Sequence, residues 1–373
     1  MVLSAISFLL LLGYAVLIRY YYGHFKKLPL FSPGAGMPKT FVSVIIAARN
    51  EAANLPPLLH ALAAQTYPPH LFEVILVDDF STDNTMQVVR TFSKPYIAVL
   101  QPAVPAAESS KKKAIETGVL KAKGPLLLIT DADCIPPPRW IETMALFHEK
   151  TGAVFIAAPV KFTHNHTLLQ RFQAVDFLVL QGITAASVAA QFHTMCNGAN
   201  LAYTKRVFEA VNGFEGINHI ASGDDMLLMH KIWLKEKEKV QYVKSNEAIV
   251  ATAPMHTWKA FVAQRKRWAS KTAHYNDKRV FFVLLFIYLL NCWFFVLLIA
   301  ALWNSRSLLL CVGFLLLKTA VEWPFAAMVA DFYKERSLMR FFLLFQPLHI
   351  AYTALVGFIS QLGTYEWKGR KTK

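Results

Sequence analysis

Paired aspartates after short apolar runs are the residues best suited to chemistry. Asp131 and Asp133 flank a single alanine directly after the apolar run 126–130. In an extended segment, residues two apart point to the same side. Two carboxylates on one side supply the hard oxygen ligands that divalent cations such as Mg²⁺ prefer. We therefore predict a metal site here, and such an ion would also hold a diphosphate.

A second acidic segment, residues 78–83, follows the apolar run 73–77 in the same way. Aspartate is common in turns after strands, so one such segment alone would favour a structural role. Two of them after strands of one sheet favour a ligand site instead. No glycine-rich phosphate loop of the Walker or dinucleotide type is present, so a metal and basic side chains would have to hold the phosphates.

Two further segments have alternatives that the pattern leaves open. Asp224 and Asp225 precede a helical stretch, where a carboxylate serves as a helix N-cap, as a general base, or as both. The basic run 111–113 also precedes a helical stretch, and it either binds phosphate or forms a solvated charged face.

The elements that position these residues follow from the hydrophobic pattern. Continuous apolar runs at 41–47, 73–77, 96–100 and 126–130 predict strands of a parallel sheet that is buried on both faces. Helical patterns at 52–65 and 84–92 fall between them, and Asp83 is suited to cap the second. This alternation predicts a doubly wound α/β fold, whose ligands bind beyond the carboxyl ends of the strands.

Apolar segments at both ends of the chain predict a membrane protein. Residues 2–18 carry no charge and Arg19 follows them, so we expect an uncleaved anchor over 1–22 with its N-terminus outside. Residues 281–303 and 308–330 are long enough to span a bilayer. Within the latter, Lys318 and Glu322 lie four apart and are expected to pair. Residues 341–362 either span or re-enter.

Composition and charge narrow the function classes. The chain of 373 residues is 55% apolar and 17% charged, which excludes a disordered chain, and its four scattered cysteines do not suggest a disulfide scaffold. The net charge of +15 would suit nucleic acid. However, basic residues gather beside the apolar spans and in 256–279, which we interpret as an amphipathic helix at the membrane interface.

Taken in order, these motifs resemble those of membrane-bound family-2 glycosyltransferases with the GT-A fold. The resemblance includes ceramide-glucosyltransferase-like enzymes and polysaccharide synthases, and it covers most of the chain, from about residue 41 to residue 268. It implies a Rossmann-like α/β GT-A domain over 39–255, an interfacial helix over 256–279, and a membrane region over 280–373 with two or three spanning helices and a basic tail.

The resemblance also implies a role for each matching residue. The nucleotide-sugar site would comprise Ala47, Arg49, Glu51, Asp78, Asp79, Lys111, Asp131, Gln264, Arg267 and Trp268. The DxD motif would bind Mg²⁺ or Mn²⁺ through Asp131 and Asp133. The acceptor side would comprise Asn197, Gly198 and Asn200. Asp225 would be the catalytic base, with Asp224 beside it, where the family more often has Glu. Gln264, Arg267 and Trp268 match a Gln-x-x-Arg-Trp motif.

The implied activity is inverting transfer of a sugar from a nucleotide-diphospho-sugar, more often UDP than GDP. The implied acceptor is a membrane lipid at the cytoplasmic face, in the inner membrane if the source is bacterial. Two alternatives are a processive polysaccharide synthase and a catalytically silent membrane scaffold. The small number of spans favours the lipid acceptor over a polymer channel, and the full set of acids argues against a scaffold. No nucleic-acid partner is expected.

Overall fold

The computed structural model describes residues 1–34, 36–92, 94–103, 110–163, 167–220, 223–270, 277–360, 365–367 and 370–372. Its contacts divide the chain into two compact units. A helical unit comprises Met1–Leu28, His164–His193 and Pro254–Tyr365. A sheet unit comprises Pro29–Thr163, Thr194–Ala253 and Glu366–Lys373.

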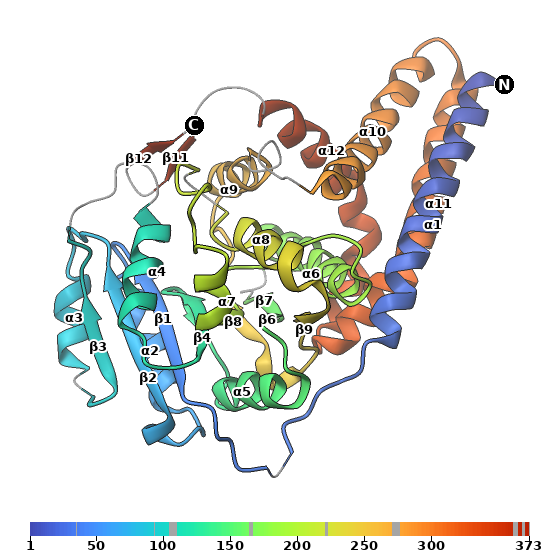
Figure 1. The fold of residues 1–373 in the computed structure, drawn as a ribbon. Coiled ribbons are helices and arrows are strands. Elements are labelled where there is room, and N and C mark those ends of the chain that lie inside the picture. The colour runs from blue at the N-terminus through green and yellow to red at the C-terminus, as the bar shows by residue number, and fades with distance from the viewer. Residues whose placement is uncertain are drawn as a thin grey trace. The chain divides into compact units, whose positions relative to one another are not determined.

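The sheet unit is built on a seven-stranded sheet in the order β3-β2-β1-β4-β8-β6-β9 (Figure 1). Its first four strands are parallel, as predicted: β1 (Val42–Ala48), β2 (Phe72–Asp78), β3 (Ile97–Leu100) and β4 (Leu126–Asp131). Val44, Ile45 and Ile46 are completely buried. Burial on both faces explains why these strands lack an apolar–polar alternation.

The other half of the sheet differs from the all-parallel prediction. Strand β8 (Leu201–Thr204) is antiparallel to both β4 and β6 (Phe155–Ala157), and β9 (Val240–Tyr242) is parallel to β6. A smaller sheet has the order β5-β10-β7, in which β5 is Cys134–Ile135, β10 is Val250–Thr252 and β7 is Val160–Phe162. The sheet unit is therefore a mixed Rossmann-like fold.

Six α-helices are described in the sheet unit: α2 (Leu55–Ala63), α3 (Thr85–Thr91), α4 (Ser110–Lys121), α5 (Trp140–Thr151), α7 (Lys205–Ala210) and α8 (Met226–Glu236). The predicted helices 52–65 and 84–92 correspond to α2 and α3. Short 3-10 helices lie at Pro69–Leu71 (η1), Lys237–Lys239 (η2) and Asn246–Ala248 (η3). The Asp83 carboxylate accepts the Thr85 N–H at 3.0 Å, at the start of α3 as predicted.

The helical unit contains α1 (Val2–Lys27), α6 (Leu168–Ala189), α9 (Trp258–Ser270), α10 (Lys278–Ala301), α11 (Ser305–Phe332), η5 (Arg336–Phe341) and α12 (Phe342–Ile359). Five described helices are long and apolar enough to cross a membrane: α1, α6, α10, α11 and the segment Arg336–Ile359. Helix α1 lies beside α11 (Figure 1).

Helix α6 was not predicted as part of this unit, because the sequence pattern placed all of 39–255 in one domain. Of the most apolar 18-residue stretch of α6, 72% is buried inside the protein, compared with 17% for the corresponding stretch of α1. Helix α6 is therefore a central packing element of the helical unit. Of the predicted interfacial segment 256–279, α9 forms the first part, and residues 271–276 lie outside the described residues.

Four polar residues from three helices form what we call the helix cluster: Tyr14, Lys318, Glu322 and Gln346. Lys318 Nζ lies 2.6 Å from Glu322 Oε1, which confirms the predicted pair, and it also donates to Gln346 Oε1 at 2.7 Å. Tyr14 and Gln346 both donate to the Glu322 carboxylate. Gln346 lies within the segment 341–362, and its amide is hydrogen-bonded to both Lys318 and Glu322.

The C-terminal residues form two short strands, β11 (Tyr365–Trp367) and β12 (Arg370–Thr372). Residues 368 and 369 of the predicted basic tail lie outside the described residues.

Candidate active site

Strand register brings the predicted motifs to one edge of the sheet. Ala48 at the end of β1 is paired with Asp78 of β2, and Ala47 is paired with Asp131 of β4. The strands are parallel, so their carboxyl ends and the loops that follow them meet there. Residues more than 80 positions apart in the sequence therefore share one site.

The loops after β1 and β2 are joined by several hydrogen bonds. Arg49 Nη1 donates to the Asp79 carbonyl at 2.6 Å, and the Glu51 N–H donates to Thr85 Oγ1 at 2.8 Å. The Thr82 N–H donates to Asn50 Oδ1 at 2.8 Å. The two predicted nucleoside motifs thus form one structural element. Arg49 contributes by holding the second loop.

The acids of the second loop are buried. Asp78 and Asp79 are 2% and 4% exposed. Asp78 accepts hydrogen bonds from the Ser81 N–H and from Gln101 Nε2, both at 3.3 Å. The Asp79 N–H donates to the Ala48 carbonyl at 2.8 Å. Burial with hydrogen-bonded partners gives these carboxylates fixed positions at the sheet edge.

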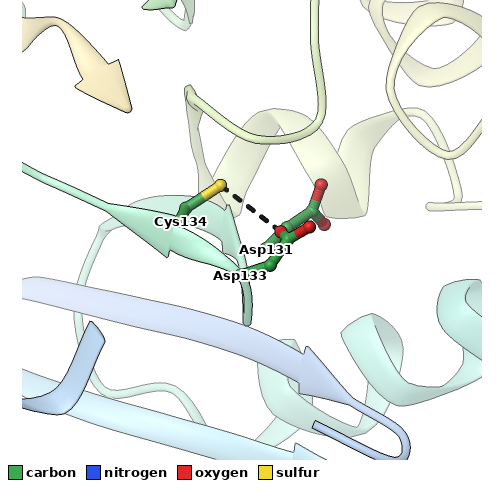
Figure 2. A group of neighbouring side chains, drawn as sticks. All are labelled: Asp131, Asp133 and Cys134. Carbon is green, nitrogen blue, oxygen red and sulfur yellow. Dashed lines mark hydrogen bonds between the residues drawn. The ribbon is translucent and has the colours of Figure 1, made fainter. Parts of the chain in front are cut away.

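The predicted metal pair follows β4 directly. One ligand atom from each of Asp131, Asp133 and Cys134 falls within 4.8 Å of the others (Figure 2). Burial, together with the two carboxylates, raises the pKa of the Cys134 thiol well above its usual range. The two carboxylates supply oxygen ligands, which suit Mg²⁺ or Mn²⁺.

Lys111 joins the metal pair to the third acidic segment. Its Nζ lies 2.8 Å from Asp131 Oδ1 and 3.0 Å from Asp224 Oδ2. Burial alone would lower the pKa of Lys111, but the neighbouring carboxylates outweigh it and raise the pKa well above its ordinary value. Lys111 therefore carries its charge at neutral pH.

The geometry distinguishes the three lysines that the sequence left ambiguous. Lys112 is buried and its Nζ donates to the carbonyls of Ile217 and Ile220, at 2.8 and 2.6 Å. The Lys113 side chain is 51% exposed and lies 3.5 Å from Glu116. Of the three, Lys111 is the one at the acidic site.

Asp225 is oriented by two backbone N–H groups. Its Oδ1 accepts the Met226 N–H at 2.8 Å, so it caps α8 as one alternative proposed. Its Oδ2 accepts the Gly198 N–H at 3.0 Å. Asp224 turns instead to Lys111. We call Lys111, Asp131, Asp133, Asp224 and Asp225 the sheet-edge cluster, which holds four carboxylates and one ammonium.

The predicted acceptor loop contributes unequally to this cluster. A β-carbon at Gly198 would lie 3.2 Å from Lys111 Nζ, so glycine allows the loop to approach closely. Asn197 Oδ1 accepts the Ala199 N–H within the loop. Asn200 is completely buried, and its amide bonds Pro159, Ala248 and Trp140. Asn200 therefore supports the loop from inside the fold.

The decisive comparison concerns residues 43–211, which match the sequence pattern described as "Glycosyl transferase family 2". These residues form a glycosyl transferase family 2 domain. The matched residues include the predicted nucleoside motifs, Lys111, the predicted metal pair and the predicted acceptor loop.

Relatives of known name share this domain. Glycosyltransferase AglE of Haloferax volcanii is 32% identical over 189 residues, which are 50% of this chain and 59% of AglE. A beta-monoglucosyldiacylglycerol synthase of Nostoc is 27% identical over 238 residues, 61% of this chain and 48% of that protein. The chain thus spans about half the length of these relatives.

A solved structure shares the fold over nearly the whole chain. The mannosyltransferase PcManGT from Pyrobaculum calidifontis, in complex with GDP-Man and Mn²⁺, has a TM-score of 0.58 at 18% identity. The likeness covers 95% of this chain and 99% of that one. It confirms the predicted GT-A-like fold of the glycosyltransferase domain.

The Gln-x-x-Arg-Trp motif lies in the helical unit, on α9. Gln264, Arg267 and Trp268 are partly exposed there, and the Trp268 ring packs against Phe177 of α6.

Sequence analysis missed the residue that anchors α9. Arg265 is 5% exposed, its Nη2 lies 2.8 Å from Asp176 Oδ2, and its guanidinium carbon lies 4.2 Å from the Trp268 ring centre. Tyr352 and His349 of α12 also bond Asp176, at 2.7 and 3.1 Å. A lone aspartate in the apolar stretch 168–189 was the available signal, because such a charge requires a partner.

Proposed function

We propose that this protein transfers a sugar from a nucleotide-diphospho-sugar to a hydroxyl group of a membrane lipid. The observation that carries the proposal is the sheet-edge cluster, which lies beside the joined loops after β1 and β2. Its residues Lys111, Asp131 and Asp133 fall within the family 2 match over 43–211. Its four carboxylates and one ammonium suit a site that binds a cation and a diphosphate and accepts a proton.

Asp131 and Asp133 are the residues proposed to hold Mg²⁺ or Mn²⁺. The proximity of their oxygens supports this assignment. When bound, the ion would neutralise charge on the departing nucleoside diphosphate. The Mn²⁺ in the structure of PcManGT supports the choice of metal.

Asp225 is the proposed general base. Two backbone N–H groups fix the orientation of its carboxylate, and Lys111 pairs with Asp224 rather than with Asp225. In this role Asp225 removes the proton from the acceptor hydroxyl as the hydroxyl oxygen attacks the anomeric carbon. Because a single displacement forms one bond as it breaks the other, it inverts the anomeric configuration.

Positive side chains would complete the donor site. Lys111 is proposed to contact the diphosphate, and its contact with Asp131 supports this role. Arg267 on α9 is proposed to add a second positive charge. Glu51, Asp78 and Asp79 are proposed to contact the nucleoside. UDP is the proposed carrier, and PcManGT is bound to GDP-Man, so both nucleotides require testing.

A lipid acceptor fits the rest of the chain. Five described helices are long and apolar enough to span a membrane. Arg19, Lys26 and Lys27 follow the apolar part of α1, and this supports a multi-pass protein with its catalytic domain on the cytoplasmic side. The Nostoc relative is named as a synthase of a glucosyl lipid, which supports the acceptor class.

The test is a screen of donors against lipids with the full-length protein purified in detergent. UDP- and GDP-sugars are offered with Mn²⁺ or Mg²⁺, with and without a mixed lipid extract. Nucleoside diphosphate release and transfer of labelled sugar to lipid are both measured. We expect release that depends on one donor, on the metal and on lipid, with one labelled lipid product.

Two other results would overturn the proposal. Release without lipid, accompanied by a high-mass labelled product, would indicate a polysaccharide synthase. Absence of release with every donor, metal and lipid combination would contradict the proposed activity.

A further inference from the structure

The Lys111 ammonium contacts a carboxylate oxygen that the proposed divalent cation would also need as a ligand. Its ammonium lies 2.8 Å from Asp131 Oδ1, an oxygen of the proposed metal pair. The same ammonium lies 3.0 Å from Asp224 Oδ2, beside the proposed base. Lys111 thus already neutralises part of the charge that would attract a divalent ion.

The surroundings hold the ammonium in this bridging position. Gly198 provides the room, because its missing β-carbon would lie 3.2 Å from Lys111 Nζ and 3.5 Å from Asp224 Oδ2. The neighbouring Lys112 is anchored elsewhere by two backbone carbonyls, which fixes this turn of α4. The Lys111 side chain is only 20% exposed, so water screens its charge weakly.

A divalent ion bound to Asp131 would lie close to this ammonium. Ligand oxygens lie about 2.0–2.6 Å from Mg²⁺ or Ca²⁺. The ion and the Lys111 ammonium are both positive, so they would repel each other while both contact the Asp131 carboxylate. The repulsion is relieved when the ammonium pairs with another anion instead of Asp131. The negatively charged diphosphate of the proposed donor would supply such an anion.

We infer that Lys111 competes with the divalent cation for Asp131, so that the cation binds tightly only together with a nucleoside diphosphate. The diphosphate oxygens accept the Lys111 ammonium and release Asp131 to the metal. Binding of metal and nucleotide is then coupled, and each raises the affinity for the other by the same factor. This inference rests on the proposed function, since it assumes a metal at Asp131 and Asp133.

The test measures Mn²⁺ binding to the full-length protein in detergent, by the electron paramagnetic resonance signal of free Mn²⁺. Titrations are run without nucleotide, with UDP and with GDP, and are corrected for Mn²⁺ bound by the nucleotide itself. We expect the wild-type protein to bind Mn²⁺ at least about tenfold more tightly with the nucleotide it uses.

Removal of the ammonium should weaken this coupling. Lys111→Met is expected to bind Mn²⁺ alone about tenfold more tightly than the wild-type protein. Lys111→Gln, which keeps a hydrogen-bond donor without the charge, should behave in the same way and guards against a folding defect. Lys113→Met removes the same charge from an exposed position on the same helix and should match the wild-type protein.

The outcomes separate this inference from the proposed function. If the wild-type protein binds Mn²⁺ with nucleotide but neither Lys111 variant binds Mn²⁺ alone more tightly, the competition is wrong and the metal site stands. If Lys113→Met gains as much affinity as Lys111→Met, net charge explains the effect and the inference fails. If the wild-type protein binds no Mn²⁺ with either nucleotide, the proposed metal site itself is overturned.

Discussion

The protein contains two lysine–carboxylate clusters that differ in the number of carboxylates they gather and in how deeply these are buried. In the helix cluster, Lys318 pairs with the single carboxylate of Glu322, and Tyr14 and Gln346 add hydrogen bonds. In the sheet-edge cluster, Lys111 contacts two of four carboxylates, those of Asp131 and Asp224. The side chains of Lys318 and Glu322 are 1% and 9% exposed, whereas that of Asp131 is 34% exposed.

The difference separates a structural role from a chemical one. A buried charge pair without further partners is costly, and complete pairing within apolar helices makes the helix cluster tolerable there. The sheet-edge cluster gathers four carboxylates, and one of them, Asp131, is partly exposed. Carboxylates gathered in this way are typical of sites that bind a ligand, which is why we assign the chemistry to the sheet edge.

The largest effect is expected when one carboxylate charge is removed from the sheet-edge cluster. Asp133→Asn removes one proposed metal ligand, and metal stabilisation of a leaving group is worth several kcal/mol. We expect sugar transfer to fall about a thousandfold and donor binding to lose its dependence on Mn²⁺. Isothermal titration with and without Mn²⁺ measures the second effect. An Asp133→Asn protein with unchanged metal dependence would remove Asp133 from the ligand role.

Substitution in the helix cluster should lower the stability of the protein and leave nucleotide binding unchanged. Lys318→Met leaves the Glu322 carboxylate buried without its cation, which costs about 3 kcal/mol. We expect a clear fall in the melting temperature in detergent and an unchanged Kd for nucleotide. Lys318→Met combined with Glu322→Leu should recover most of the loss. Equal melting temperatures for the single and double variants would show that the pair is not the cause.

A smaller effect should follow from crowding the sheet-edge cluster without changing its charge. Gly198→Ala places a methyl group 3.2 Å from Lys111 Nζ, so the ammonium or the loop must shift. Overpacking of this kind costs about 1–3 kcal/mol, and we expect about a tenfold loss of transfer rate. Gly313→Ala is the control, because nothing lies within 4 Å of its added β-carbon. The comparison fails if both variants lose activity equally.

The smallest effect belongs to Asp83, whose carboxylate accepts hydrogen bonds from Thr85 at the start of α3 and from Ala52. Asp83→Ala removes the acceptor of the Thr85 and Ala52 N–H groups and should cost about 1 kcal/mol of unfolding free energy. Asn84→Ala is the control, since Asn84 makes no side-chain cap bond at α3. Equal losses in the two variants would contradict this assignment.

The same carboxylate predicts a pH dependence. Burial tends to raise the pKa of Asp83, but hydrogen bonds from Thr85 and Ala52 outweigh it, so the folded pKa lies below its ordinary value of 3.8. The stability that these bonds supply is therefore present above pH 3.8 and is lost as the pH falls through the folded pKa. The difference in unfolding free energy between wild type and Asp83→Ala should shrink on acidification, as chemical denaturation would show.

Sequence patterns predicted the parts of the fold that repeat a simple rule. The four parallel strands are continuous apolar runs, and the acids that follow them had to meet at one edge. Strand β8 escaped prediction because it comprises only the four residues Leu201–Thr204, too few for a continuous apolar run. Its antiparallel pairing with β4 depends on contacts far apart in the sequence.

The site divides in the same way. Asp131, Asp133 and Asp225 were predicted from their positions after strands and before a helix. The choice among Lys111, Lys112 and Lys113 required three dimensions, because helical geometry sends neighbouring side chains in different directions. Arg265 and Asp176 are 89 residues apart, so no local pattern pairs them.

The most direct test of the account separates sugar transfer from nucleotide binding in Asp225→Asn. With the donor that the wild-type protein uses, we predict that transfer to lipid falls by at least about a hundredfold, the usual range for a lost general base. The Kd for the nucleoside diphosphate should stay within about threefold, since Lys111 and the metal pair are retained. Asp331→Asn, the same change at an exposed carboxylate, should transfer normally. Normal turnover by Asp225→Asn would contradict the central claim that Asp225 accepts the proton of the acceptor hydroxyl.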